Sequence, residues 1–325
     1  MMKQIIKDSI FNSAYRFLEK KMPLMVKHMA NTGQGTDECL EIGCLPMNVH
    51  FYSPIPDIKD LENRKIWQKK SELHGIDFHP NEQLAMLEQL GSEFGSECEW
   101  PLTPTAIPTQ FYLKNNSFSY GCASALHTII RHFKPRHFIE IGSGHSSKII
   151  SKALEMNKND DPSCTPEYIV VDPYPGEMVS TQLAFISKMV QEKVECVDPK
   201  LFEILGENDI LFVDSGHTVR TGSDVNFIVL EVLPRLRPGV IIHFHDINLP
   251  YEYPKVYFTN PQFRMFWTEA YLLQAFLSFN RDFEILLGMN YLQTDHMSDY
   301  CRAFPRFKLA DNWANSGSFW IRRKL

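Results

Sequence analysis

The chain has 325 residues, of which 44 % are hydrophobic, so it can bury a sizeable core and is not a disordered protein. A net charge of −6 argues against nucleic acid as the main partner. No stretch reaches the length of a membrane span, and the first residues lack the apolar run of a signal peptide. Seven cysteines without a Cys-x-x-Cys motif predict reduced thiols in a cytoplasmic chain, with Cys122 and Cys196 as small core residues.

Residues 1–110 are predicted to form an N-terminal extension or a lid-like subdomain. A helix is expected over residues 3–22, and the Gly-, Pro- and Asn-rich stretch 31–62 is expected to be irregular. Leucines spaced at three residues predict a short helix over 81–90, and three prolines mark 99–110 as a linker.

Residues 111–325 are predicted to form the main domain, in which strands and helices alternate. Apolar runs predict strands at 138–141, 168–171, 194–197, 210–213, 240–244, 283–287 and 318–322. Helical spacing predicts helices around 126–133, 149–154, 177–190, 223–236 and 263–279. This alternation indicates an α/β fold with a doubly wound, mostly parallel sheet. The last two strands have no clear helix between them, which suggests an antiparallel final hairpin.

A tight glycine turn, Gly142-Ser143-Gly144, joins the first strand of this domain to its helix. Glycine is needed where the backbone turns sharply or where a ligand must approach it. The helix N-terminus that follows offers free N–H groups, so the unit can hold a nucleotide-like ligand. An ordinary strand–turn–helix without a ligand is the other interpretation, because a short Gly-x-Gly is a weak motif.

Four predicted strands end in polar groups, and in a doubly wound sheet those ends meet at one rim. Asp172 follows the second strand, where an acid can accept both hydroxyls of a ribose, although it could also be a turn residue. His243 shares a strand face with His245 and is more simply a hydrogen-bonded core histidine. The remaining rim residues are Asp214, His217, His245 and Asp246.

Four segments at predicted strand ends follow one another in the order Glu-Ile-Gly-Ser-Gly-His-Ser-Ser, Val-Val-Asp-Pro-Tyr-Pro, Leu-Phe-Val-Asp-Ser-Gly-His and His-Phe-His-Asp-Ile. In this order they resemble the nucleotide-site motifs of class I S-adenosylmethionine-dependent methyltransferases. The sequence is most similar to a bacterial branch whose fourth and fifth strands end in Asp-Ser-x-His and His-Asp-Ile. Segments 250–254 and 271–276 extend the resemblance, which covers about residues 115–325.

The resemblance implies a Rossmann-like methyltransferase fold and S-adenosylmethionine as cofactor. Glu140 and the turn Gly142, Ser143 and Gly144 would hold the methionine part and the sugar edge. Asp172 would bind the ribose, Asp214 would also lie at the cofactor, and Asp198 or its neighbours would lie near the adenine. One departure is Ser146, where many family members have a third glycine.

A hydroxyl acceptor must lose its proton during methyl transfer, and two chemistries could remove it. His217 or His245 could act as general base, with Asp246 beside them. Alternatively, Asp214 and Asp246 could bind a magnesium-like ion that lowers the pKa of the acceptor. The bacterial branch suggests small-molecule or saccharide hydroxyls, and four aromatic residues after the fifth strand could either cover the acceptor or pack in the core: Tyr251, Tyr253, Tyr257 and Trp267.

Three alternatives remain open on the sequence. The fingerprint of a nicotinamide-dependent oxidoreductase, Gly-x-Gly-x-x-Gly, requires a glycine at position 147, where this sequence has a serine. A metal hydrolase would use His243, His245 and Asp246, without a further His-rich motif to complete the site. A module of the same fold could have lost its activity, although acids at 140, 172, 214 and 246 argue against this.

Overall fold

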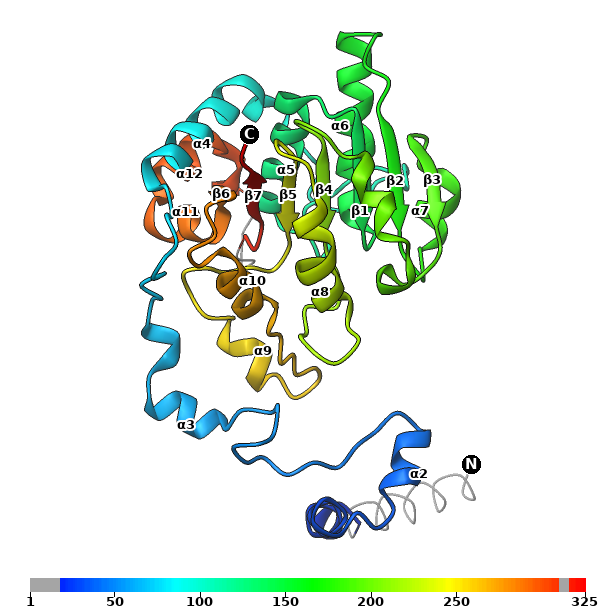
Figure 1. Ribbon diagram of the computed structural model, residues 1–325, viewed down its shortest axis with the longest axis vertical. Coiled ribbons are helices and arrows are strands. Elements are labelled where there is room, and N and C mark those ends of the chain that lie inside the picture. Colours follow the sequence, from blue (N-terminus) through cyan, green and yellow to red (C-terminus); the bar gives the residue numbers. More distant parts are fainter. Residues whose placement is uncertain (1–17, 310–315) are drawn as a thin grey trace, which may run out of the picture. The chain divides into compact units, whose positions relative to one another are not determined.

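The computed structural model describes residues 18–309 and 316–325 (Figure 1). The chain divides into two compact units: residues 1–66 with 258–266, and residues 67–257 with 267–325. Among the described residues, no helix has the length and apolar character needed to cross a membrane. The helix expected over 3–22 lies mostly outside the described residues, although residues 18–32 are helical.

Among its described residues, the first unit contains little regular structure besides this helix. Two short helices, α2 (Thr36–Glu41) and α3 (Ile58–Asn63), interrupt the stretch that was expected to be irregular, and neither buries a residue. Asp57 caps α3 by accepting hydrogen bonds from the backbone N–H groups of Lys59 and Asp60. This local contact accounts for α3, which a scan for apolar spacing does not find.

The second unit is built around a seven-stranded sheet of order β3-β2-β1-β4-β5-β7-β6. Neighbours from β3 to β5 are parallel, and β7 runs antiparallel to both β5 and β6. The doubly wound, mostly parallel sheet with an antiparallel last strand is therefore confirmed. The strands are β1 (His137–Ile141), β2 (Glu167–Val171), β3 (Ile186–Val190), β4 (Ile210–Val213), β5 (Ile241–Phe244), β6 (Phe283–Gly288) and β7 (Phe319–Arg323).

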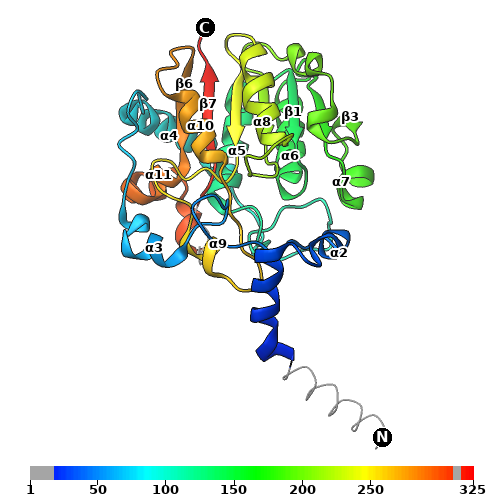
Figure 2. The ribbon, with the colours of Figure 1, turned by 60° about the horizontal axis from the view of Figure 1, so that its bottom comes forward.

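Helices cover both faces of this sheet (Figure 2). They are α4 (Pro80–Phe94), α5 (Tyr120–Phe133), α6 (His145–Asp160), α7 (Glu177–Gln182), α8 (Asp224–Phe227), α9 (Lys255–Thr259), α10 (Glu269–Leu277), α11 (Met289–Asp295) and α12 (Met297–Ala303). The last two residues of α9 belong to the first unit. Shorter turns of helix are η1 (Ile66–Gln68), η2 (Gly95–Glu97), η3 (Val194–Cys196), η4 (Pro199–Ile204), η5 (Ile228–Val232), η6 (Leu233–Arg235) and η7 (Pro305–Leu309).

The prediction for the third strand was wrong. The helix α7 ends at Gln182, residues 186–190 form β3, and residues 194–196 form η3 instead of a strand. Because β3 is an edge strand, Ser187 and Lys188 are exposed, and it lacks the continuous apolar run that marks a strand buried on both faces. Cys196 is likewise exposed and not part of the core, whereas Cys122 is buried as expected.

Two helix predictions need smaller corrections. The helix expected over 223–236 is capped by Ser223, but it continues as the π-helical turn η5 and ends in η6, where Pro234 stands. Its predicted apolar face is buried as expected. The helix expected over 263–279 begins only at Glu269. Residues 258–266 belong to the first unit instead.

The prediction of a final hairpin was also wrong. The strands β6 and β7 are antiparallel neighbours, but α11 and α12 lie between them in the sequence. Polar residues in these short helices interrupt the apolar spacing from which a helix is predicted. The helix α12 packs against α4, and α4 packs against α5. Residues 80–94 therefore belong to the same compact unit as the sheet.

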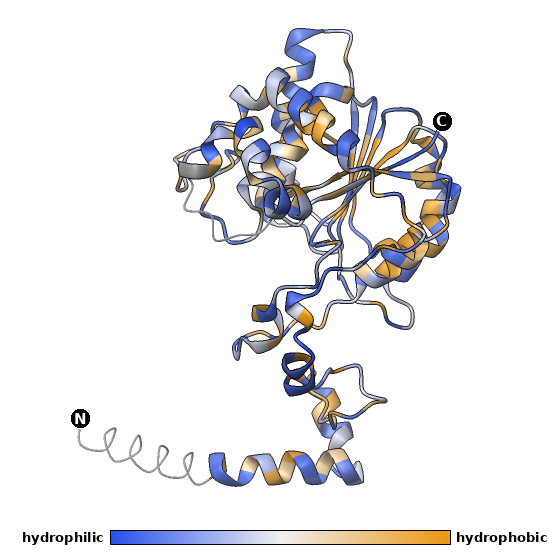
Figure 3. Ribbon diagram, turned by 90° about the vertical axis from the view of Figure 1, so that its left-hand side faces the viewer, coloured by the Kyte–Doolittle hydropathy of each residue, from blue (hydrophilic) through white to orange (hydrophobic). Residues whose placement is uncertain are grey.

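The sheet is hydrophobic through its centre (Figure 3). All residues of β4 and β5 are buried, and the ring of His243 stacks on Phe212 at 4.1 Å between ring centroids. The strand order reverses direction at β1, because β2 lies on one side of it and β4 on the other. Ligands of such sheets bind beyond the carboxyl ends of the strands at this switch point.

Candidate functional site

The glycine turn after β1 is built so tightly that only glycine fits at its first position. Gly142 has a φ of 77°, and a Cβ there would lie 1.9 Å from the carbonyl oxygen of Asp214. The strand β4 is held alongside by the Asp214 N–H, which donates to Ile141. The turn and the end of β4 are therefore in direct backbone contact. At Gly144, by contrast, nothing lies within 4 Å of an added Cβ, so a ligand can approach the backbone there.

Glu140 lies beneath this turn and is fully buried. One carboxylate oxygen accepts a hydrogen bond from Ser146 Oγ at 2.6 Å, and the other accepts from Ser147 Oγ at 2.8 Å and from the hydroxyl of Tyr168. Burial raises the pKa of Glu140 to about 7, although the three hydroxyl donors oppose that shift. The Glu140 carboxylate thus ties β1, β2 and α6 together below the turn, and the serine at position 146 is one of its partners.

Asp172 lies at the end of β2, next to the turn, and is partly exposed. Its Oδ2 accepts hydrogen bonds from the backbone N–H of Ser143 at 2.9 Å and from Ser143 Oγ at 2.5 Å. Its Oδ1 accepts from the N–H of Tyr174 at 2.8 Å. A carboxylate has about four acceptor positions, so these three bonds leave one free on Oδ1.

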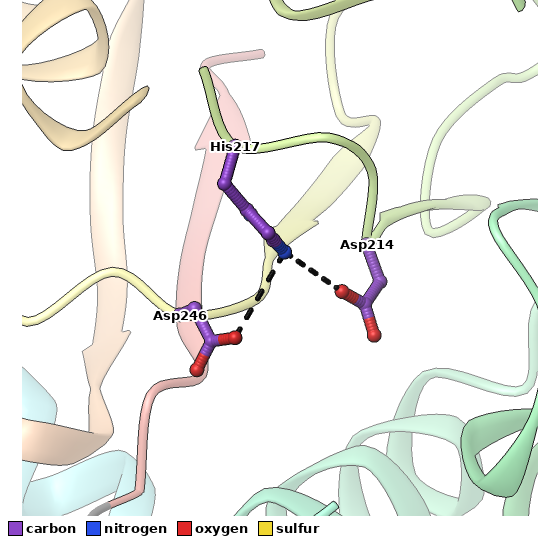
Figure 4. A group of neighbouring side chains, drawn as sticks. All are labelled: Asp214, His217 and Asp246. Carbon is purple, nitrogen blue, oxygen red and sulfur yellow. Dashed lines mark ion pairs between the residues drawn. The ribbon is translucent and has the colours of Figure 1, made fainter. Parts of the chain in front are cut away.

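The ends of β4 and β5 bring together Asp214, His217 and Asp246 (Figure 4). His217 Nε2 lies 3.2 Å from Asp214 Oδ1 and 3.8 Å from Asp246 Oδ2. One donor atom from each of the three residues lies within 4.8 Å of the other two. The predicted gathering of these side chains at one rim is thus seen in the geometry.

His245 completes the cluster from β5. Its Nδ1 lies 3.3 Å from Asp246 Oδ2 and 3.5 Å from Asp214 Oδ1, and its ring stacks on Phe118. Burial opposes a charge on His245, but the Asp246 and Asp214 carboxylates raise its pKa well above the usual range. The same neighbours act on Asp214: burial opposes its ionisation, and the imidazole of His245, followed by that of His217, holds the pKa of Asp214 well below its usual range.

Glu269 is a member of this cluster that the sequence analysis missed. It is the first residue of α10, is 1 % exposed, and its Oε2 lies 2.8 Å from His217 Nδ1. Burial opposes the imidazolium of His217, but Asp214 and then Glu269 raise the pKa of His217 to about 10. The backbone of His217 is fixed as well, because its carbonyl accepts the N–H groups of Thr268 and Glu269. No local sequence motif predicts this role for Glu269, which lies 52 residues after its partner His217.

Two residues of the cluster adopt a backbone conformation that is rare for side chains other than glycine. His217 has a φ of 54°, and Asp246 has a φ of 58°. Gly317 supports the second of these, because a Cβ on it would lie 2.8 Å from the Cα of Asp246. Such strain persists only where the surrounding structure fixes it, and it is concentrated at functional sites.

Other candidate residues lie elsewhere or serve in packing. His243 is buried beneath the rim, and its Nε2 contacts Ser318 Oγ at 3.0 Å, as expected for a core histidine. Asp198 is exposed and caps η4 through the N–H of Lys200. Tyr251 bonds to Asp295, and the hydroxyl of Tyr253 accepts the N–H of Ala270.

The other two aromatic residues lie beside the cluster. The ring of Trp267 is 4.4 Å from that of His217, and Tyr257 contacts Trp267 edge to face at 4.9 Å. Burial raises the pKa of Tyr257, and the nearby Asp246 carboxylate adds to the shift. An aromatic wall therefore stands next to His217.

Comparison with known proteins agrees with this architecture. A family model described as a methyltransferase domain matches residues 139–247, which run from β1 to the residue after Asp246. Over 188 residues the chain is also 36 % identical to an uncharacterised protein of Archaeoglobus fulgidus, a match that covers 55 % of this chain and 80 % of that protein. The match to the family model spans the glycine turn, the Asp172 strand end and the cluster on β4 and β5. The chain therefore contains a segment, residues 139–247, that matches a methyltransferase domain.

Proposed function

We propose that this protein is an S-adenosylmethionine-dependent methyltransferase that acts on a hydroxyl oxygen of a small molecule or saccharide. The observation that carries the proposal is the cluster of Asp214, His217, His245 and Asp246 at the ends of β4 and β5. The end of β4 lies against the glycine turn, and β5 is the next strand of the sheet. This puts groups able to accept a proton next to the expected cofactor position. The match to a methyltransferase domain disfavours the nicotinamide oxidoreductase.

The residues around the turn fit such a cofactor. The space beside Gly144 leaves the backbone accessible, and the free acceptor position on Asp172 Oδ1 suits a ribose hydroxyl. A second ribose hydroxyl could bond to Oδ2 if Ser143 Oγ turned away. Glu140 is fully buried and its carboxylate already accepts three hydroxyls, so we assign it to holding the turn rather than to binding the cofactor. The cofactor supplies an electrophilic methyl group, and these residues fix its position.

The proton of the acceptor would be taken at the cluster by one of two routes. In the first, Glu269 holds His217 through Nδ1 and leaves Nε2 to receive the proton, as in other carboxylate–histidine pairs. Because the pKa values of His217 and His245 are raised, whichever imidazole acts as base must first lose its own proton. A metal ion that takes the place of this proton offers the second route.

In the second route, Asp214, Asp246 and His217 Nε2 would hold a divalent cation in place of the imidazolium proton. Two carboxylate oxygens and one imidazole form a donor set that suits a transition metal ion better than magnesium. Such an ion would lower the pKa of the acceptor hydroxyl. His245 and Glu269 would then orient the ligands through hydrogen bonds.

The aromatic wall suggests the acceptor class. Trp267 and Tyr257 lie beside His217, and flat aromatic faces bind sugars and other rings. The likeness to the bacterial branch with Asp-Ser-x-His and His-Asp-Ile strand ends supports saccharide or secondary-metabolite hydroxyls. That residues 1–110 form an extension that shapes the acceptor pocket remains a prediction.

The proposal is tested by methyl transfer from labelled S-adenosylmethionine to a set of saccharide and phenolic hydroxyl acceptors. His245→Ala and Asp246→Asn should lower turnover by roughly 10²–10⁴-fold. His74→Ala, a change at an exposed histidine of the same unit, should leave turnover unchanged. A chelator should stop the reaction on the metal route alone. Full activity of both cluster variants in the presence of chelator would contradict both routes, and cofactor binding without any transfer would favour the non-catalytic module.

A further inference from the structure

Exposed apolar side chains are concentrated in one part of the described chain, residues 18–52, which we call the N-terminal arm. Twelve large hydrophobic residues of this arm are between 40 % and 88 % exposed. The most exposed among them are Ile42, Phe51 and Tyr52. A monomeric protein rarely exposes so much apolar surface in one stretch, and a concentration of this kind marks an interaction surface.

The helix over residues 18–32 carries part of this apolar surface as a stripe. Hydrophobic and hydrophilic residues alternate along the helix (Figure 3). Four of its apolar residues follow at spacings of four, three and four, which places them on one face: Leu18, Met22, Met25 and Met29. In the sequence, the same spacing continues toward the N-terminus with Phe11 and Tyr15. This alternation of spacings is typical of the seam along which two helices pack against each other.

The two helices of the arm carry opposite charges. The helix over residues 18–32 has three lysines against one glutamate, whereas α2 has three acids and no base. Among the residues that the structure describes, none of these six groups forms an ion pair: Lys20, Lys21, Lys27, Asp37, Glu38 and Glu41. A surface of anionic lipid would attract the first helix and repel the second. A second copy of the arm offers both charges at once.

Antiparallel packing of two such helices matches these charges. It brings Lys20 and Lys21, near the start of one helix, to the end of the other helix. There α2 of the second copy begins, four residues after the end of its helix. Two-fold symmetry repeats the arrangement, so that both basic helices meet an acidic one.

The arm also offers enough surface for a stable interface. Twelve large apolar residues at roughly half exposure or more present on the order of 1,000 Å². A standard interface buries about 800 Å² of each partner. Met22, Met25 and Met47 are among the exposed residues, and methionine is enriched in interfaces because its flexible side chain adapts to a partner.

We propose that the N-terminal arm binds the N-terminal arm of a second copy of this chain, so that the protein is a two-fold symmetric dimer. The apolar stripes of the two helices pack against each other in antiparallel orientation. Lys20 and Lys21 of each copy face Asp37 and Glu38 of the other. This interface does not depend on the proposed methyltransferase activity.

Sedimentation velocity of the full chain tests the apolar part of the interface. Wild type should be a dimer at micromolar concentration. Met22→Glu combined with Met25→Glu should raise the dissociation constant about 100-fold or more, because it buries carboxylates without partners. Leu230→Glu, a matched change at an exposed residue of the second unit, should leave the dimer intact. The circular dichroism of each variant should equal that of wild type, because all three side chains are exposed.

A mixing experiment tests the charges. Lys20→Glu combined with Lys21→Glu should weaken the dimer about tenfold or more, because like charges then face each other. Asp37→Lys combined with Glu38→Lys, in a second protein, should do the same. An equimolar mixture of the two proteins should form a heterodimer with about the affinity of wild type, because each acidic helix then meets a basic one.

Three outcomes would overturn the inference. A monomeric wild type would show that the arm does not bind a second copy, and its binding to vesicles of phosphatidylcholine and phosphatidylserine would identify a membrane surface as the occupant. A dimer that persists in the methionine variant would use another surface. A mixture of the charge-reversed proteins that fails to associate would rule out the antiparallel pairing of the helices with α2.

Discussion

Replacing Glu140 by glutamine should change how the stability of the protein depends on pH. The carboxyl group has its pKa raised by burial from 4.5 to about 7. Because the folded state holds this proton more tightly than the unfolded state, the proton stabilises the fold below about pH 4.5. The stabilisation declines between pH 4.5 and 7 and is lost above pH 7 as the buried group ionises. Glutamine does not titrate and shows no such decline.

The size of the effect follows from the shift. One pKa unit corresponds to 1.36 kcal/mol, so a shift of about 2.5 units amounts to about 3 kcal/mol. Glutamine also offers an amide N–H₂ group to hydroxyls that need an acceptor, which costs about 1–3 kcal/mol at any pH. We therefore expect Glu140→Gln to be destabilising at pH 4.5, and its cost to be about 3 kcal/mol smaller at pH 8.

The assay is urea unfolding of both proteins between pH 4.5 and 8, with the free energies of unfolding subtracted at each pH. Subtraction removes the contributions of groups that titrate alike in the two proteins. Glu167→Gln changes an exposed glutamate at the start of the neighbouring strand β2, and its stability should run parallel to that of wild type. A difference between wild type and Glu140→Gln that stays constant across this pH range would refute the reasoning.

Three further predictions concern the turn and the cluster. Gly142→Ala should destabilise the fold by about 3 kcal/mol or more, because the added Cβ would meet a backbone carbonyl at a residue with positive φ. The control Gly176→Ala, with open space around it, should cost less than about 1 kcal/mol. Equal melting temperatures of the two variants would contradict the predicted clash at Gly142. Asp172→Ala should weaken S-adenosylmethionine binding about tenfold or more by calorimetry, and unchanged affinity would contradict the ribose assignment. Glu269→Gln should lower the pKa of His217 by roughly one unit or more, measured by NMR titration of the ring, and an unmoved titration would mean that their contact has no electrostatic effect.

The sheet could be predicted from sequence wherever its strands are buried on both faces. The runs that became β1, β2, β4 and β5 are continuous and apolar, and the helices after β1 and β4 show clear spacing. The edge strand β3 could not be found in the same way, because an edge strand tolerates exposed residues such as Lys188. Short polar helices such as α11 and α12 carry too little periodicity to be recognised.

The candidate site could be predicted only where it follows directly from a strand end. Asp214, His245 and Asp246 come immediately after β4 and β5, so topology alone brings them together. Glu269 reaches the cluster through a long connection from β5 to α10, and no rule of spacing places it there. The engagement of Glu140 by Ser146, Ser147 and Tyr168 depends on three elements at once, and only the structure shows it.

The most direct test of the central claim is titration calorimetry of the full chain with S-adenosylhomocysteine and, in parallel, with NAD. The former shares the adenosyl and amino-acid parts that the turn and Asp172 are proposed to hold. We expect one molecule of S-adenosylhomocysteine to bind per chain, with no heat of binding for NAD. Binding of NAD, or no binding of S-adenosylhomocysteine, would contradict the proposed methyltransferase site.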